Sequence, residues 1–112
     1  MTANIYFEPE ESGLKIFEMA QDSDLSYAFD MFVIWEDIKT GDLYYASDSG
    51  CSCPVPFEDE SRETITKIDL NYSLGIFSED IHSWNQKDEH EFKESPTRIQ
   101  EIITKVQQHL NR

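Results

Sequence analysis

Basic residues are scarce in this chain: nine lysines and arginines stand against 23 aspartates and glutamates, giving a net charge of −14. Binding to a nucleic-acid backbone depends on basic side chains that displace counterions from phosphates, so direct nucleic-acid binding is not expected. Attraction to anionic lipid is not expected for the same reason. A basic partner protein would be drawn toward such a surface, although the charge can also serve only to keep a small protein in solution.

Long apolar runs are also missing. No stretch reaches the about 20 residues that a membrane-spanning helix needs. The first residues, 1–4, lack the basic and then apolar pattern of a secretory signal. We therefore expect a cytoplasmic protein that does not enter the membrane. Its two cysteines are then expected to be thiols or metal ligands rather than a structural disulfide.

What the chain does contain is enough apolar material for one core. Hydrophobic residues make up 38% of the 112 residues and aromatic residues 12%, which distinguishes the chain from a disordered polyampholyte. There is no internal repeat and no low-complexity tract. We expect a single acidic domain over residues 1–112.

Residues 29–36 carry the strongest strand pattern. Met31 and Trp35 fall on one face of this segment, and Phe32 and Ile34 fall on the other. Apolar side chains on both faces predict a strand inside the sheet rather than at its edge.

The neighbouring segments predict an antiparallel meander. Gly41 suits a tight turn that needs a positive φ, so residues 43–47 are expected to form a hairpin with the strand before them. Segments 5–7 and 14–20 are expected to bring the first half to about four strands. Residues 63–72 also alternate and favour a strand, although the same stretch has apolar residues at helical spacing.

The C-terminus has the clearest helical pattern. Ser95 can be its N-cap and Pro96 its first residue, where a missing N–H does no harm. A short helix is expected near Ser78. The apolar stripe of the C-terminal helix, which should cover one face of the sheet, consists of Ile99, Ile102, Ile103, Val106 and Leu110. The predicted class is α+β: a meander of about four to five strands packed by the C-terminal helix and a short second helix.

The segment 45–58 is the most unusual part of the chain. It holds both cysteines, two of the four prolines and one of the four glycines, and no basic residue. A segment with so many backbone-constraining residues is expected to have a defined shape, and such loops often carry function. Ser49 and Asp48 are expected to stabilise a turn at Gly50 through bonds to their own backbone.

Two chemical alternatives use residues of this segment. Cys51 and Cys53 could bind zinc together with His82 and His90, although paired zinc ligands more often have the spacing C-x2-C. Asp48, Ser49 and His82 could also be combined into a hydrolase triad. The Gly-x-Ser-x-Gly elbow of one large hydrolase class is missing, and a chain this acidic offers many such combinations. We expect no cofactor and no enzymatic activity.

The run Gly41-Asp42-Leu43-Tyr44-Tyr45, together with Trp35 and the sequence ASDSGCSCPVPFED at 46–59, resembles a family of short uncharacterised bacteriophage proteins, chiefly from phages of actinobacteria. The resemblance covers about residues 29–59 and implies a phage gene expressed in a bacterial cytoplasm. No activity and no site residue comes with it.

These observations predict a non-enzymatic binding protein that engages a basic host protein, for example one that handles nucleic acid or takes part in defence. The acidic surface would speed association and the segment 48–59 would provide specificity. The residues expected to contact the partner are Tyr44, Tyr45, Asp48, Phe57, Glu58, Asp59 and Glu60. A small structural or zinc-binding domain that uses Cys51 and Cys53 is the alternative.

Overall fold

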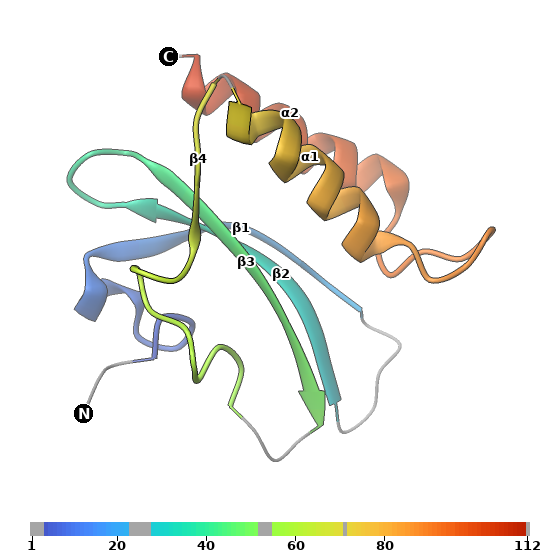
Figure 1. Cartoon of the computed structure of the whole chain (residues 1–112), viewed down its shortest axis with the longest axis horizontal. Helices are drawn as coiled ribbons and strands as arrows, with labels where there is room; N and C mark the ends of the chain where they lie inside the picture. The colour runs from blue at the N-terminus through green and yellow to red at the C-terminus, as the bar shows by residue number, and fades with distance from the viewer. Residues whose placement is uncertain (1–3, 23–27, 52–54, 71, 112) are drawn as a thin grey trace.

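The computed structural model describes residues 4–22, 28–51, 55–70 and 72–111. A short 3-10 helix, η1, precedes a four-stranded sheet, and two helices follow it (Figure 1). The bounds are η1 Pro9–Ser12, β1 Leu14–Gln21, β2 Ala28–Asp37, β3 Leu43–Cys51, β4 Thr66–Ile68, α1 Tyr72–Asn85 and α2 Pro96–Leu110. The predicted α+β class is confirmed.

The strands form an antiparallel meander in the order β1-β2-β3-β4, also as predicted. Gly41 closes the β2–β3 turn with a φ of 79°, a value that glycine reaches without steric cost. The Asp37 carboxylate supports this turn by accepting bonds from the N–H groups of Lys39 and Thr40. From the turn, β2 and β3 pair without interruption as far as Ala28 and Cys51.

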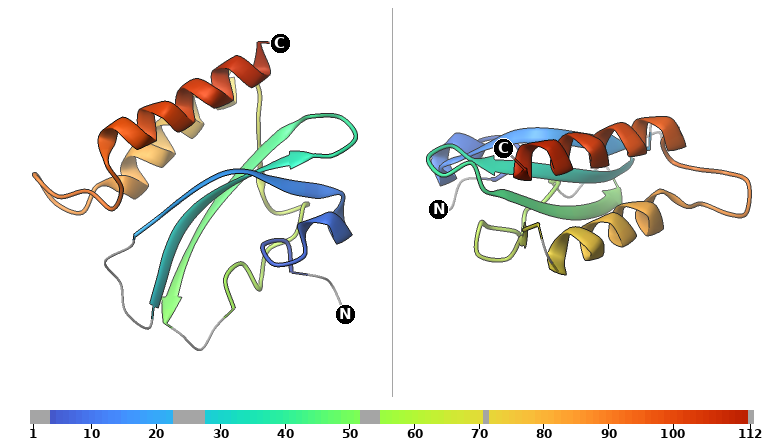
Figure 2. Two further views of the ribbon diagram at one scale, coloured as in Figure 1. Left: turned by 180° about the vertical axis from the view of Figure 1, so that it is seen from behind. Right: turned by 90° about the horizontal axis from the view of Figure 1, so that it is seen from above.

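β2 lies inside the sheet and is buried on both faces. Phe32 and Ile34 contribute to a core beneath the two helices, while Met31, Val33 and Trp35 contribute to a second core on the opposite face. Figures 1 and 2 show α1 and α2 together on one side of the sheet and the segments around residues 4–12 and 55–65 on the other. Both faces of this small sheet therefore bury apolar surface.

The C-terminal helix begins as predicted. The Ser95 side chain accepts a hydrogen bond from the Arg98 N–H at 3.1 Å, and Pro96 is the first helical residue. Of its apolar stripe, Ile99, Ile102, Ile103 and Val106 are buried, and Leu110 packs against the same core. The helix covers one face of the sheet because its apolar residues recur at the helical period.

Segment 5–7 is a turn rather than a strand. The side-chain oxygen of Asn4 accepts hydrogen bonds from the N–H groups of Tyr6 and Phe7. The chain therefore turns at this point, where a strand would be extended. Trp35 donates its indole N–H to the Ile5 carbonyl at 2.8 Å. Ile5 is thus buried by tertiary contact instead of by sheet pairing.

The prediction of a strand over 63–72 is correct for only three residues, Thr66–Ile68. Ile65 is buried in the core that contains Trp35, while Ile68 is buried beneath the helices. The helix expected near Ser78 instead begins at Tyr72 and has 14 residues, because Leu74 and Phe77 add a turn to its apolar face. In the described part of the chain, no helix is long and apolar enough to cross a membrane.

Candidate functional site

The acidic segment after Tyr45 begins as sheet and not as a loop. β3 continues through Gly50 to Cys51, so no turn forms at Gly50. The chain returns along the sheet at Val55, where two backbone bonds close a tight turn: Glu58 N–H to Val55 O at 3.2 Å and Glu60 N–H to Phe57 O at 3.1 Å. The described residues of this segment thus belong to strand pairing as far as Cys51 and to a tight turn from Val55 onward.

Asp48 fastens the returning turn to β3. One of its carboxylate oxygens accepts the Phe57 N–H at 2.7 Å, and the other accepts the Ser49 N–H at 3.0 Å. The Asn4 side chain connects the same turn to the N-terminal segment by donating to the Pro56 carbonyl at 2.9 Å. The turn at residues 55–60 is therefore joined to β3 through Asp48 and to the N-terminal segment through Asn4.

Phe57 was predicted to contact a partner, but it is a core residue. It is 1% exposed, and its ring meets Trp35 edge-on with the ring centres 5.2 Å apart. Its φ of 60° is rare for a residue with a side chain, and the tight turn imposes it while the ring stays in the core. Packing, not recognition, explains why an aromatic residue stands here.

The two adjacent tyrosines point to opposite faces of the sheet. Tyr45, also predicted to contact a partner, is 6% exposed; it stacks on Phe32 and donates its hydroxyl to Asp80 of α1 at 2.5 Å. Burial, together with this bond to a carboxylate, raises the pKa of the Tyr45 hydroxyl. Tyr44 is half-buried on the other face beneath the Arg62 guanidinium. The Tyr45 ring is therefore not available to a partner, whereas the Tyr44 ring remains partly exposed.

The four remaining predicted residues are brought together in one place, which we call the acidic hollow. Its volume is about 270 Å³. It is lined by the carboxylates Asp48, Glu58, Asp59 and Glu60. The apolar residues Phe29 and Val55 and the small residue Ser49 complete the lining. Lys and Arg side chains are absent from its described lining, so nothing there neutralises the carboxylates.

Phe29, Ser49 and Val55 were not among the predicted site residues. Phe29 lies opposite Gly50 in the β2–β3 pairing, and counting residues outward from the turn at Gly41 would have found it. Val55 lines the hollow because the chain returns along β3 after residue 54. No local pattern in the sequence indicates that return.

An ion pair anchors the segment that follows the hollow. Arg62 bonds to the Asp37 carboxylate and donates to the Ser12 carbonyl at 2.7 Å. The Arg62 bond, followed by the backbone N–H groups of Thr40 and Lys39, lowers the pKa of Asp37 to about 2. Arg62 thereby ties residues 61–65 to η1 and to the β2–β3 turn.

A family model matches residues 3–109 of this chain, which is nearly its whole length. The family is described as a domain of unknown function. The chain belongs to the family DUF7574. No curated protein and no solved structure matches it significantly. The match assigns no activity to the chain, and it does not test the resemblance to phage proteins over residues 29–59.

Among the described residues of this DUF7574 domain, neither the zinc site nor the hydrolase triad is assembled. Cys53 and the side chain of Cys51 lie outside the described residues. His82 is exposed on α1 and His90 is exposed in the connection after it; among the described residues no group of three or more potential ligands is arranged to hold a metal ion. Asp48 bonds to Phe57 on the face of the sheet opposite α1, so His82 does not reach it.

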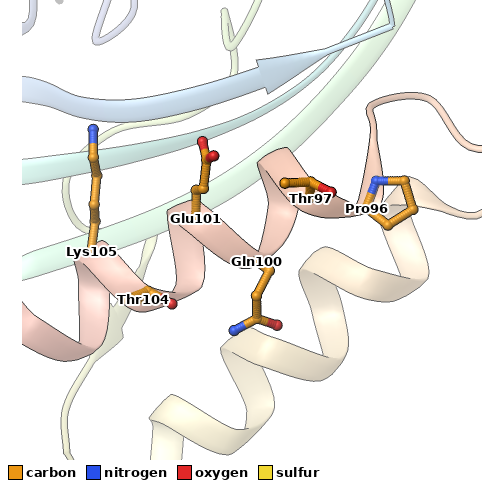
Figure 3. Close-up of a pocket in the computed structure, with 6 residues that line it drawn as sticks. All are labelled: Pro96, Thr97, Gln100, Glu101, Thr104 and Lys105. Atoms are coloured by element: carbon orange, nitrogen blue, oxygen red, sulfur yellow. The ribbon is translucent and has the colours of Figure 1, made fainter.

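A second and larger hollow of the DUF7574 domain, of about 620 Å³, lies along α2. All of its described lining comes from that one helix, and Figure 3 shows Glu101 and Lys105 directed to one side of it and Gln100 to the other. Lys105 is already paired with Glu18 of β1 at 2.5 Å. Binding sites are usually concave and bring several polar groups together, which the acidic hollow does and this helix surface does not.

Proposed function

We propose that this DUF7574 domain is a non-enzymatic protein-binding factor that engages a basic surface of another protein through the acidic hollow. The observation that carries the proposal is that four carboxylates from two chain segments line one hollow whose described lining has no basic side chain. Phe29 and Val55 lie among them. A lysine or arginine side chain has the matching character, because it packs its aliphatic stem on apolar surface and pairs its charged end with carboxylates.

The distribution of positive charge supports the proposal. Most of the nine basic residues are used in ion pairs within the chain, on the sheet, on α2 and in the connections. Lys93, for example, is 2.6 Å from Asp30, and Arg98 is 2.7 Å from Glu18. No lysine or arginine occurs between residues 40 and 61. The surplus negative charge is therefore uncompensated around the hollow, where it would steer a basic partner.

The resemblance to short phage proteins suggests where such a factor would act. We propose a phage-encoded protein that binds a host protein in the bacterial cytoplasm. Proteins that handle nucleic acid present lysine and arginine to phosphates. An acidic hollow can compete for the same basic side chains, so a nucleic-acid-handling or defence protein of the host is the partner class that fits.

Affinity purification of the tagged chain from host-cell lysate, at low and high salt with mass-spectrometric identification, tests the proposal. The decisive variant is Glu58→Lys with Asp59→Lys, which reverses two exposed carboxylates of the hollow. The matched control is Glu89→Lys with Glu91→Lys, which makes the same change of charge in the exposed connection after α1. We expect a specific partner to be lost from the first variant and retained by the second.

Two results would count against the proposal. Equal loss of the partner from both variants would mean that total charge, and not the hollow, holds it. A broad set of basic proteins that all dissociate at high salt would mean that the acidity acts only as a nonspecific field.

A further inference from the structure

We infer that the outer edge of β3, from Ser47 to Gly50, accepts an extended lysine- or arginine-bearing segment of the partner as an added β-strand. This inference rests on the proposed function and states how the basic partner would be held. The evidence for it is the edge of β3 that is unpaired among the described residues, and the acidic hollow beside that edge determines which kind of partner segment fits.

The pairing of β2 with β3 shows which backbone groups of β3 point outward. The Asp37 N–H donates to the Asp42 carbonyl at 2.8 Å, so Asp42 directs its backbone groups toward β2. Backbone groups alternate sides along an antiparallel strand. Because the register continues without a shift to the end of β3, Ser47 and Ser49 direct their N–H and C=O groups away from β2.

The fourth strand covers only the beginning of this edge. β4 pairs with residues Leu43, Tyr44 and Tyr45 and then ends. Among the described residues, no strand pairs with β3 beyond Tyr45 on this side. The Ser49 N–H bonds to the neighbouring Asp48 carboxylate instead, at 3.0 Å. A carbonyl of an added strand can take that place.

The side chains along this edge leave room for another strand. Ser47, Asp48, Ser49 and Gly50 are small, and no lysine, proline or bulge interrupts them. Proteins that protect a sheet edge use those devices. The opposite edge of this sheet shows one of them, because the register of β1 shifts between Ile16 and Glu18.

Charge decides which segment can occupy the edge. The hollow beside it is lined by Asp48 and by three acidic residues of the returning turn. A second copy of the chain would bring another −14 charges, so it does not fit. Alternate residues of a strand share a face, so the partner segment should carry basic residues at every second position to direct them toward the carboxylates. This is strand addition, in which backbone bonds give affinity and alternate side chains give specificity.

The test titrates the intact chain with a synthetic peptide in which lysine alternates with threonine and valine. The peptide is also made with N-methyl groups on either of its two alternating sets of backbone nitrogens. Only one set faces the protein in an added strand, so we expect one methylated peptide to lose affinity by about tenfold or more and the other to bind unchanged. The amides of Ser47 and Ser49 should gain protection from hydrogen exchange when the unmodified peptide binds.

Because the protein is unaltered, a folding defect cannot explain the result. Equal binding of the two methylated peptides, or no binding of the unmodified one, would overturn the inference. A variant extends the test: Ser47→Pro removes an outward N–H, and Ser47→Ala keeps it. After circular dichroism shows that both are folded, only the proline variant should bind more weakly.

The inference and the proposed function can fail separately. If charge reversal at Glu58 and Asp59 releases the cellular partner but both methylated peptides bind equally, the hollow is the site and strand addition is wrong. If one methylated peptide is rejected but charge reversal leaves the cellular partner bound, the edge accepts a strand and the assignment to the acidic hollow is wrong.

Discussion

Aromatic and acidic side chains share the segment from Tyr45 to Glu60, and the fold uses them differently. The rings of Tyr45 and Phe57 are buried in the two cores on opposite faces of the sheet. Glu58 and Asp59, which directly follow Phe57, are exposed. Asp48 has a structural role and also lines the hollow, since its carboxylate accepts a hydrogen bond from the Phe57 backbone N–H. Packing and recognition are thus divided between neighbouring residues.

At the residue scale, replacing Phe57 tests its role in packing. Phe57→Ala removes a buried ring that contacts Trp35 and Tyr6, so we expect the free energy of unfolding to fall by about 3–5 kcal/mol. The matched control is Phe7→Ala, since Phe7 is 60% exposed and its replacement should change stability by about 0.5 kcal/mol at most. Urea denaturation of both variants measures the difference. Similar values for the two would contradict the assignment of Phe57 to the core.

At the scale of elements, hydrogen bonds and ion pairs between side chains connect segments that are not joined by strand pairing. Residues 61–65 reach the β2–β3 turn through Arg62 and Asp37. α2 reaches β1 through Arg98 and Lys105, which both bond to Glu18. Burial alone would raise the pKa of Glu18, but these two hydrogen bonds outweigh it and lower that pKa. The elements are therefore connected by charged bonds as well as by the cores.

The Asp37–Arg62 tie predicts a specific pH dependence. The pKa of Asp37 is lowered to about 2 in the folded chain, mainly by the Arg62 bond, whereas an unfolded aspartate has a pKa of about 3.9. A carboxyl group whose pKa is lowered in this way contributes stability that is present above about pH 4 and is lost as the pH falls through about 2. Asp37→Asn should therefore destabilise the chain at neutral pH, and its difference from the wild type should become much smaller near pH 2 and disappear below it.

Chemical denaturation across this pH range measures that difference. Asparagine keeps an oxygen for the Lys39 and Thr40 N–H groups, so the variant isolates the charge. Asp42→Asn is the control, because Asp42 pairs with Lys67 at 3.6 Å where both side chains are largely exposed, and such surface pairs contribute little. If Asp37→Asn cost the same stability at pH 2 as at pH 7, the ionic bond would not be its cause.

Some elements could be predicted from sequence and others could not. The strand β2 and the helix α2 follow from periodic apolar residues, a signal that lies within each segment. The Ser95 cap is equally local. The start of α1 and the short length of β4 could not be predicted, because residues 63–72 favour a strand by alternation but also have apolar residues at helical spacing. The burial of Ile65 in one core and Ile68 in the other decides between them.

At the scale of the whole molecule, negative charge is unevenly compensated. The basic residues pair with carboxylates of the sheet, of the turns and of the connections. The carboxylates of the acidic hollow have no such partner among the described residues that line it. A net charge of −14 destabilises a compact chain by self-repulsion, and an unpaired cluster concentrates that effect.

This imbalance predicts that salt stabilises the fold. Raising the salt concentration from about 20 mM to about 300 mM shortens the range over which exposed charges interact, so repulsion should weaken and the free energy of unfolding should rise. The increase should be smaller for Glu58→Lys with Asp59→Lys, which removes part of the repulsion. Urea denaturation at both salt concentrations measures the two increases. A fall in stability with salt would show that the internal ion pairs outweigh the surplus charge.

The sequence alone determined the class of the fold, the buried middle strand, the capped C-terminal helix and the acidic character of the surface, because periodicity, capping and charge are properties of short segments. Tertiary structure decided which residues of the segment 45–60 are available to a partner. Tyr45 meets Asp80 and Phe57 meets Trp35 across more than twenty residues of chain, and no local pattern encodes those contacts. The acidic hollow and the open edge of β3 likewise exist only because the chain returns along a strand that β4 leaves partly uncovered.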